Sequence, residues 1–440
     1  MNILKVNGCI HFCVDFKLRT PLLLRSGDEG EFTDSAIERT ADGRVHINGY
    51  VWASLLRRAL SRLKETENLV SRIGRYQRNE KKQIDNLGVS TLWCGTTLGS
   101  PAGSDVRHGN RINRKWGAAV GKALFSDEVE NPGGILTLEG NLFCEAQDNA
   151  NAIIQQLRGA LWVIHEGIEN IGGGWSYGCG RLEVDKIGIE ILNLTDPLQR
   201  ARLWDFPGLA NNQPAILDKA AHMIDAKRGW TKLHVEGRIE PGQLLAIHSS
   251  QPDYEKYKDW SHLPDTFVFR GMCLDKGEVK PKLMPLITGK SFRQAVLSTA
   301  IERQLMTKRY AECDKLRERW FGATDQGGII AVLDAPIRNA AFEVLHRIQL
   351  CEHSFQNIQL FSGEYLTGGE FDLEILVDEG QENRETKELI GYVKDILTEI
   401  GPEAETKQKK EAPPGWYRLG ATTTCTGQFS IKEWRAYHVG

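Results

Sequence analysis

The chain has 440 residues, of which 41% are hydrophobic and 26% charged, and its formal net charge is −3. This size and composition predict two or three domains, and the charge excludes a protein that coats nucleic acid through bulk electrostatics. Any nucleic-acid contact must therefore rest on local sites. Nine cysteines without a paired CxxC motif are typical of a reducing compartment. Without a visible signal peptide or an apolar run of membrane-spanning length, we expect a soluble cytoplasmic protein with no membrane contact.

The first half of the chain predicts a mixture of strands and helices. Apolar residues alternate over residues 10–18, which indicates a half-buried strand. A polar loop follows, and residues 47–63 then have the apolar period of a helix with a basic opposite face. Residues 107–140 predict strands at both ends of a long insertion, and residues 149–166 predict a second helix.

A glycine-rich stretch, NIGGGWSYGCGRLEV at residues 170–184, follows that helix and precedes a predicted strand. Phosphate-binding loops of nucleotide cofactor sites have the opposite order, from strand into helix, so a cofactor loop is disfavoured here. The backbone amides of Gly172, Gly173 and Gly174 could instead hold a polyanion. Equally, the glycines could end the helix and form a turn.

The second half repeats the first in the same order, after a connection at residues 205–229 that holds two prolines. LPDTFVFR (263–270) matches FTDSAIER (32–39), and ITGKSFRQAVLSTAI matches INGYVWASLLRRAL. RIQLCEHSFQNIQLFS, from Arg347, matches RINRKWGAAVGKALFS, from Arg111, without a gap. The repeat predicts two tandem domains of one fold, at residues 1–204 and 230–440.

Each half resembles a RAMP domain of the type that forms the backbone of type III CRISPR interference complexes. The resemblance covers nearly the whole chain and rests on FTDSAIER before INGYVWASLLR, on the thumb-like RINRKWGAAVGKALFSDEV, and on IGGGWSYGCGRLEV. It implies an α+β fold of two tandem ferredoxin-like, RRM-like domains with thumb insertions, and RNA lying against the sheet. The fusion of two domains is most similar to the type III-D branch. Asn48 and Thr288 replace the proline usual in the family, and the last glycine loop is degenerate.

The resemblance also implies a function, a crRNA-binding backbone subunit that cleaves the target RNA paired with its guide. Asp34 and Asp265 are the implied catalytic acids and ligands of Mg²⁺, which makes the chain a metal-dependent endoribonuclease within its complex. A turn-forming role is the structural alternative for Asp34. Asp275 competes with Asp265, because spacing favours Asp275 whereas the local pattern favours Asp265.

The predicted RNA contacts lie in the thumbs, at the helix starts and in the glycine loop: Arg111, Asn113, Arg114, Lys115, Arg347, Gly49, Gly289, Lys290, Gly172, Gly173, Gly174 and Arg181. The implied partners are crRNA, target RNA, neighbouring RAMP subunits and the large subunit of the complex. The alternative function is a non-catalytic structural or capping RAMP subunit. A precursor-processing nuclease would need a catalytic histidine such as His165, which the apolar helix pattern predicts to be a core residue instead.

Overall fold

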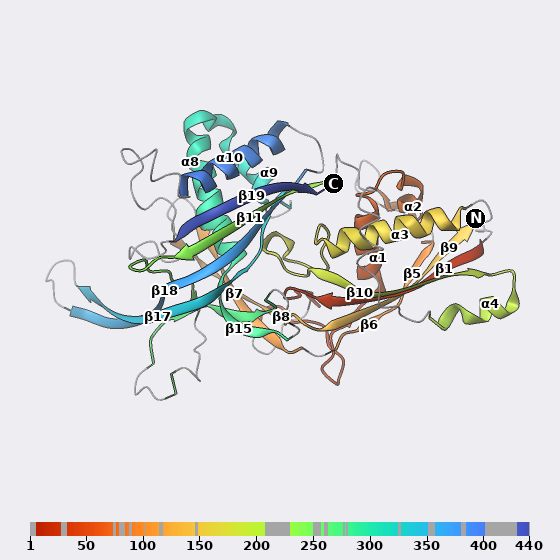
Figure 1. Ribbon diagram of the computed structural model, residues 1–440, viewed down its shortest axis with the longest axis horizontal. Coiled ribbons are helices and arrows are strands. Elements are labelled where there is room, and N and C mark those ends of the chain that lie inside the picture. Colours follow the sequence, from red (N-terminus) through yellow and green to blue (C-terminus); the bar gives the residue numbers. More distant parts are fainter. Residues whose placement is uncertain are drawn as a thin grey trace.

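The computed structural model describes residues 6–27, 33–73, 76–78, 84–87, 90–100, 102–113, 118–145, 148–206, 229–249, 257–258, 263–275, 278, 280–323, 327–350, 357–379, 384–400 and 429–439. The first half is built around an antiparallel sheet in the order β10-β1-β9-β5. Its strands are β1 (Val6–Leu18), β5 (Leu92–Cys94), β9 (Ile135–Glu145) and β10 (Leu182–Asn193). Figure 1 shows α1 (Gly49–Leu60) and α3 (Ala150–His165) lying together over this sheet.

The central strand β1 is the predicted strand, but it is buried on both faces rather than on one. Phe12 and Phe16 point into the core beneath the helices, where the Phe16 ring stacks on Trp52 of α1 at 5.3 Å between centroids. On the other face, His11 is fully buried and stacks on Phe206 at 4.4 Å. The start of the predicted connection therefore covers this part of the sheet. The resemblance described above had instead predicted RNA lying against the sheet.

The second half is built around a larger antiparallel sheet in the order β14-β15-β17-β18-β11-β19, with β16 also paired to β18. Its strands are β11 (Trp230–Ile239), β14 (Arg270–Cys273), β15 (Lys282–Ile287), β16 (Ile330–Val332), β17 (Ala335–Leu350), β18 (Asn357–Asp378) and β19 (Ser430–Val439). Its helices are α7 (Gly289–Ser291), the π-helical η5 (Phe292–Ser298), α8 (Thr299–Lys308), η6 (Tyr310–Glu312), α9 (Cys313–Phe321) and α10 (Arg384–Ile400).

Both sheets contain the same four-strand arrangement. In the first half, the strands that come first, second, third and fourth along the chain stand in the order 4-1-3-2, as β10, β1, β9 and β5. In the second half, β19, β11, β18 and β16 stand in that order as well. A helical segment follows the first strand and another follows the third, which is the βαββαβ pattern of a ferredoxin-like fold. The architecture is thus mixed α and β with antiparallel sheets, consistent with the predicted fold class.

A long hairpin accompanies each sheet at the position of a predicted thumb. The first consists of β7 (Ser104–Asn113) and β8 (Ala118–Glu130), and the second consists of β17 and the beginning of β18. In Figure 1 the second hairpin extends beyond the body of the molecule at the left, whereas β7 and β8 lie in the middle, below β18.

The two halves are joined by ion pairs and by shared apolar packing. Arg107 of β7 lies 2.6 Å from Asp334, between β16 and β17, and Arg181 pairs with Glu374 of β18 at 3.0 Å. The core of the first half also includes side chains from the second: Trp230, Ala331, Leu333 and Leu376. The remaining elements are β2 (His46–Ile47), α2 (Glu67–Arg72), β3 (Tyr76–Arg78), β4 (Ile84–Leu87), β6 (Thr97–Leu98), η1 (Trp175–Tyr177), α4 (Pro197–Ala201), η2 (Arg202–Trp204), β12 (His248–Ser249) and β13 (Phe267–Val268). Among the described residues, no helix has the length and apolarity needed to cross a membrane.

Candidate functional site

Asp34 lies on an exposed loop that is fastened to the first hairpin. Its carboxylate oxygen Oδ2 accepts hydrogen bonds from the backbone N–H of Ser126 at 2.6 Å and from the Ser126 hydroxyl at 2.9 Å. The backbone N–H of Asp34 donates in return to the Ser126 carbonyl at 3.0 Å. These bonds place an exposed carboxylate beside the middle of β8.

The hydrogen bonds from Ser126 change the chemistry of this carboxylate. The backbone N–H of Ser126, then its hydroxyl, and to a smaller extent the nearby His108, lower the pKa of Asp34 below its ordinary value. A carboxylate with a lowered pKa stays ionised at neutral pH, but it is a weaker base than an unperturbed one. Asp34 is therefore suited to orienting a hydroxyl group or a cation, and it is a modest acceptor of protons.

Asp265 makes the same contacts in the second half. Its Oδ2 accepts from the backbone N–H of Ser362 at 2.6 Å and from the Ser362 hydroxyl at 3.3 Å, while its own N–H donates to the Ser362 carbonyl at 3.0 Å. Both aspartates are exposed. The alignment of the two octapeptides in the sequence thus corresponds to two loops with the same attachment to a hairpin.

In each half, a glutamate and an arginine form an ion pair next to the loop that carries the aspartate. In the first half, Glu128 accepts from the Ile37 N–H and forms an ion pair with Arg39 at 2.9 Å. In the second half, the fully buried Glu364 accepts two bonds from Arg270, both at 2.8 Å. Glu364 also accepts from the Val268 N–H at 3.0 Å and from the Tyr257 hydroxyl at 2.6 Å.

Asp275 has different surroundings from the two loop aspartates. Its carboxylate lies 3.6 Å from the guanidinium group of Arg338 on β17. Asp265, which the local sequence pattern favoured, is therefore the residue with the contacts of Asp34, and Asp275, which the spacing favoured, is not. Loop length differs between the halves, so spacing to the next helix was a poor guide to equivalence.

A histidine stands opposite each of the two serines. On the first hairpin His108 of β7 pairs with Ser126, and on the second His346 of β17 pairs with Ser362. Both histidines are exposed. The sequence analysis did not identify them, because their relation to the serines depends on the pairing register of each hairpin. Two signals were available: the Val-x-His pattern occurs at Val106 and again at Val344, and each histidine precedes the shared LeuPheSer motif by roughly one hairpin length.

The pairing registers also correct the alignment of the thumbs. Phe361 pairs with Arg347, whereas Phe125 of the same motif pairs with Gly109. Arg111 therefore lies two positions further along its hairpin than Arg347 does, although the two segments align without a gap in sequence. Arg111 and Asn113 belong to β7, but their side chains lie outside the described part of the structure, as does that of Arg347. Residues 114 and 115, predicted RNA contacts as Arg114 and Lys115, are also outside the described residues.

The glycine-rich loop lies against the second half, and two of its predicted RNA contacts, Gly173 and Arg181, are engaged in bonds within the protein. The Gly173 N–H donates to the Leu23 carbonyl at 2.7 Å, so it is not free to bind a phosphate. Arg181 is committed to Glu374, and its guanidinium also donates to the Glu166 carbonyl at 3.1 Å. The predicted guide contacts of Gly173 and Arg181 do not match these bonds. Gly172 and Gly174 both have positive φ angles, 76° and 72°, as tight turns require.

The adjoining short helix η1 packs against β16 and α7 of the second half. Trp175 of η1 meets Trp230 edge to face, with ring centroids 5.8 Å apart. Upstream of the loop, His165 is half-buried and its Nδ1 accepts a hydrogen bond from the Val184 N–H at 3.1 Å, so it has a hydrogen-bond partner but lies at the margin of the core in which it was predicted. A Cβ on Gly178 would press on Leu333 of the second half, whereas a Cβ on Gly172 or Gly180 would meet backbone carbonyls within the first half, so close contacts of both kinds account for the glycines of the loop.

Replacing Gly180 by Ala is expected to destabilise the protein more than replacing Gly242 by Ala. Both glycines have positive φ, 74° and 86°, which costs an alanine about 1–2 kcal/mol. A Cβ on Gly180 would also overlap the carbonyl of Ile171, whereas nothing lies within 4 Å of a Cβ on Gly242. Urea unfolding of both variants measures the difference. Equal losses would show that the loop relaxes around the added methyl group.

The glycines at the two helix starts, Gly49 and Gly289, allow a close approach between helix and strand. A Cβ on Gly49 would overlap the Cys94 carbonyl, and one on Gly289 would overlap the Val332 carbonyl. Gly289 is buried, and its N–H donates to Asp334 at 2.8 Å, which argues against the predicted RNA contact there. Lys290 is exposed, with its Nζ 4.6 Å from the centre of the Phe125 ring on the first hairpin.

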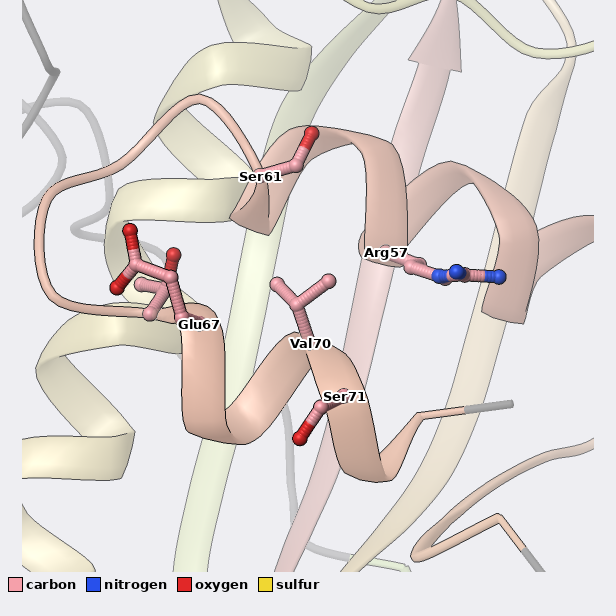
Figure 2. A pocket seen from close by; sticks show the side chains of 6 residues that line it. Arg57, Ser61, Glu67, Val70 and Ser71 are labelled. Atoms are coloured by element: carbon pink, nitrogen blue, oxygen red, sulfur yellow. The ribbon is translucent and has the colours of Figure 1, made fainter. Parts of the chain in front are cut away.

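A shallow hollow between α1 and α2 offers no comparable chemistry. Figure 2 shows the residues that line it: Arg57, Ser61, Thr66, Glu67, Val70 and Ser71. The hydroxyl groups of Ser61, Thr66 and Ser71 donate to neighbouring backbone carbonyls. In the described part of the chain, no group of three or more His, Cys, Asp or Glu side chains is arranged to hold a metal ion.

Comparison with known families gives one match. Residues 15–183 match the model of the RAMP superfamily. No curated protein matches the chain. The matched segment includes Asp34, the first hairpin and the glycine-rich loop, so this part of the chain is similar to RAMP superfamily proteins.

Proposed function

We propose that this chain is a crRNA-binding backbone subunit of a type III CRISPR effector complex, and that it cleaves target RNA paired with the guide at Asp34 and Asp265. One observation carries the proposal: the two exposed aspartates are held in the same way, each by a serine on a strand of a long hairpin. An aspartate that serves only to form a turn does not require hydrogen bonds to a hairpin strand. Two such loops in one chain favour a duplicated site over a local turn.

Such a site can cleave RNA with few groups. The 2′-hydroxyl of the nucleotide at the scissile linkage attacks the phosphorus, and the bond to the 5′-oxygen breaks, leaving a 2′,3′-cyclic phosphate and a 5′-hydroxyl. The enzyme must hold the linkage in line and orient the attacking hydroxyl group. The carboxylate of Asp34 or Asp265 accepts a hydrogen bond from that hydroxyl and takes its proton. A hairpin inserted between base pairs would splay one nucleotide and free its linkage for this geometry.

The Asp34 and Asp265 sites could each bind Mg²⁺ only when RNA is bound there as well. One carboxylate is a sufficient protein ligand for Mg²⁺ when substrate phosphates and water complete the coordination shell. Asp34 and Asp265 are the residues that would hold the ion, which would neutralise charge on the phosphate. The fused halves supply two backbone positions in one chain, as in the type III-D branch, and neighbouring RAMP subunits and the large subunit would complete the complex.

The proposal is tested with the reconstituted effector complex, Mg²⁺ and an end-labelled target RNA. We expect Asp34→Ala and Asp265→Ala each to remove one product and the double variant to remove both, with losses of at least about 100-fold in rate. Asp275→Ala is the matched control and should leave the products unchanged. EDTA should abolish both products. Target binding is measured in parallel and should be retained.

A non-catalytic structural subunit is the alternative function. The burial of the sheet face near His11 and the use of the glycine loop between the halves show that much of the chain serves packing. An unchanged set of products in every aspartate variant, with RNA binding intact, would favour that function and place the nuclease in another subunit.

A further inference from the structure

The two hairpins bring a histidine to the same side of the strand pair as each aspartate site. Residues directly opposite each other on antiparallel strands project from the same face, with Cβ atoms about 4.5–5.5 Å apart. His108 is opposite Ser126, which donates both of its hydrogen bonds to Asp34. The exposed imidazole and the exposed carboxylate therefore flank one serine midway along the hairpin.

The second hairpin repeats this placement. His346 is opposite Ser362, and Ser362 donates to Asp265 through its N–H and its hydroxyl group. The residues directly before the histidines differ, Arg107 in the first hairpin and Leu345 in the second, whereas Val106 and Val344 occupy the equivalent place two residues before each histidine. The histidine therefore recurs as part of a short Val-x-His pattern on the strand opposite each serine.

The chemistry of the linkage requires a group of this kind. Expulsion of the 5′-oxygen produces an alkoxide, which leaves readily only when it receives a proton as the bond breaks. Each aspartate is placed to act on the 2′-hydroxyl, at the other side of the phosphorus. Histidine is the side chain best able to supply a proton near neutral pH.

We propose that His108 and His346 are the catalytic general acids of the two sites, each donating a proton to the 5′-oxygen of the RNA strand. This proposal rests on the proposed cleavage function. In the complete step, the 2′-oxygen forms a bond to phosphorus, the phosphorus–5′-oxygen bond breaks, the aspartate takes the 2′-hydroxyl proton, and the imidazolium gives its proton to the departing oxygen. Proton transfers of this type contribute about 10²–10⁴-fold to rates.

The test uses the reconstituted complex with His108→Gln and His346→Gln, each variant serving as the control for the other site. His108→Gln should slow the Asp34-dependent product by at least about 100-fold and leave the Asp265-dependent product unchanged, and His346→Gln should do the reverse. A second target RNA carries a bridging sulfur in place of the 5′-oxygen at the affected linkage. A thiolate leaves without a proton, so this substrate should restore cleavage by the histidine variant.

The outcomes separate the two proposals. If the histidine variants cleave normally, or if the sulfur substrate fails to restore the lost product, the histidines are not general acids. If the histidines have only a structural role, replacing them would lower the cleavage rate equally for the ordinary target RNA and for the target with the bridging sulfur. If Asp34→Ala and Asp265→Ala leave all products in place, the cleavage function itself fails, and the assignment of the histidines fails with it.

Discussion

Glu364→Gln is expected to destabilise the protein by about 3–5 kcal/mol, because it removes the buried carboxylate that accepts two hydrogen bonds from the Arg270 guanidinium. Both side chains are withdrawn from water, with exposed fractions of 0% for Glu364 and 9% for Arg270. The substitution preserves shape, and it removes the charge that balances Arg270. Chemical denaturation, followed by tryptophan fluorescence, measures the change in the free energy of unfolding.

The first half supplies a matched control in Glu128→Gln. Arg39 pairs with Glu128 at 2.9 Å and also with Glu130 at 2.6 Å, so it keeps a carboxylate when Glu128 is neutralised. The Glu128 variant should therefore lose clearly less stability than the Glu364 variant. Equal losses in the two variants would contradict the account, because the second carboxylate would then have no protective effect.

Arg107→Ala is expected to lower the free energy of unfolding by a similar amount, about 3–5 kcal/mol. The reason is that Asp334 loses its ion-pair partner at the junction of the halves. The two side chains are 14% and 13% exposed and lie 2.6 Å apart. Asp334 also accepts the N–H of Gly289, so its charge remains fixed beside the start of α7 after the arginine is removed. The free energy of unfolding in urea is the quantity to measure.

Two further variants separate the buried pair from a general effect of lost charge. Arg44→Ala removes an exposed partner of Asp42, in a pair whose side chains are 42% and 57% exposed, and should destabilise the protein far less than Arg107→Ala. The double change Arg107→Met with Asp334→Leu replaces the pair by apolar groups and should recover most of the loss. If the double variant is as unstable as Arg107→Ala, desolvated charge is not the cause.

Much of the fold could be predicted from local pattern. The alternation over residues 10–18 identified β1, and the helical period over residues 149–166 identified α3. The match of the two octapeptides placed Asp34 and Asp265 on loops that share their contacts. These features depend on residues close in sequence, where periodicity and short motifs carry the information.

The rest depended on contacts between distant segments. The histidines opposite Ser126 and Ser362 are identified only by strand register, which an ungapped alignment of the hairpins misplaced by two residues. The burial of β1 on both faces depends on Phe206, far along the chain from His11. Arg181 looked like a phosphate contact because the sequence alone could not show its partner, Glu374, in the other half.

The apolar junction between the halves limits how the chain can be divided. Trp230, Leu333 and Leu376 complete a core that begins more than two hundred positions earlier in sequence. A gene cut within residues 207–228 would give two pieces, each with hydrophobic surface that the other piece normally covers. If the chain arose by joining two ancestral copies, the copies no longer form separate cores. A substitution at the junction in one half then affects the stability of both halves together.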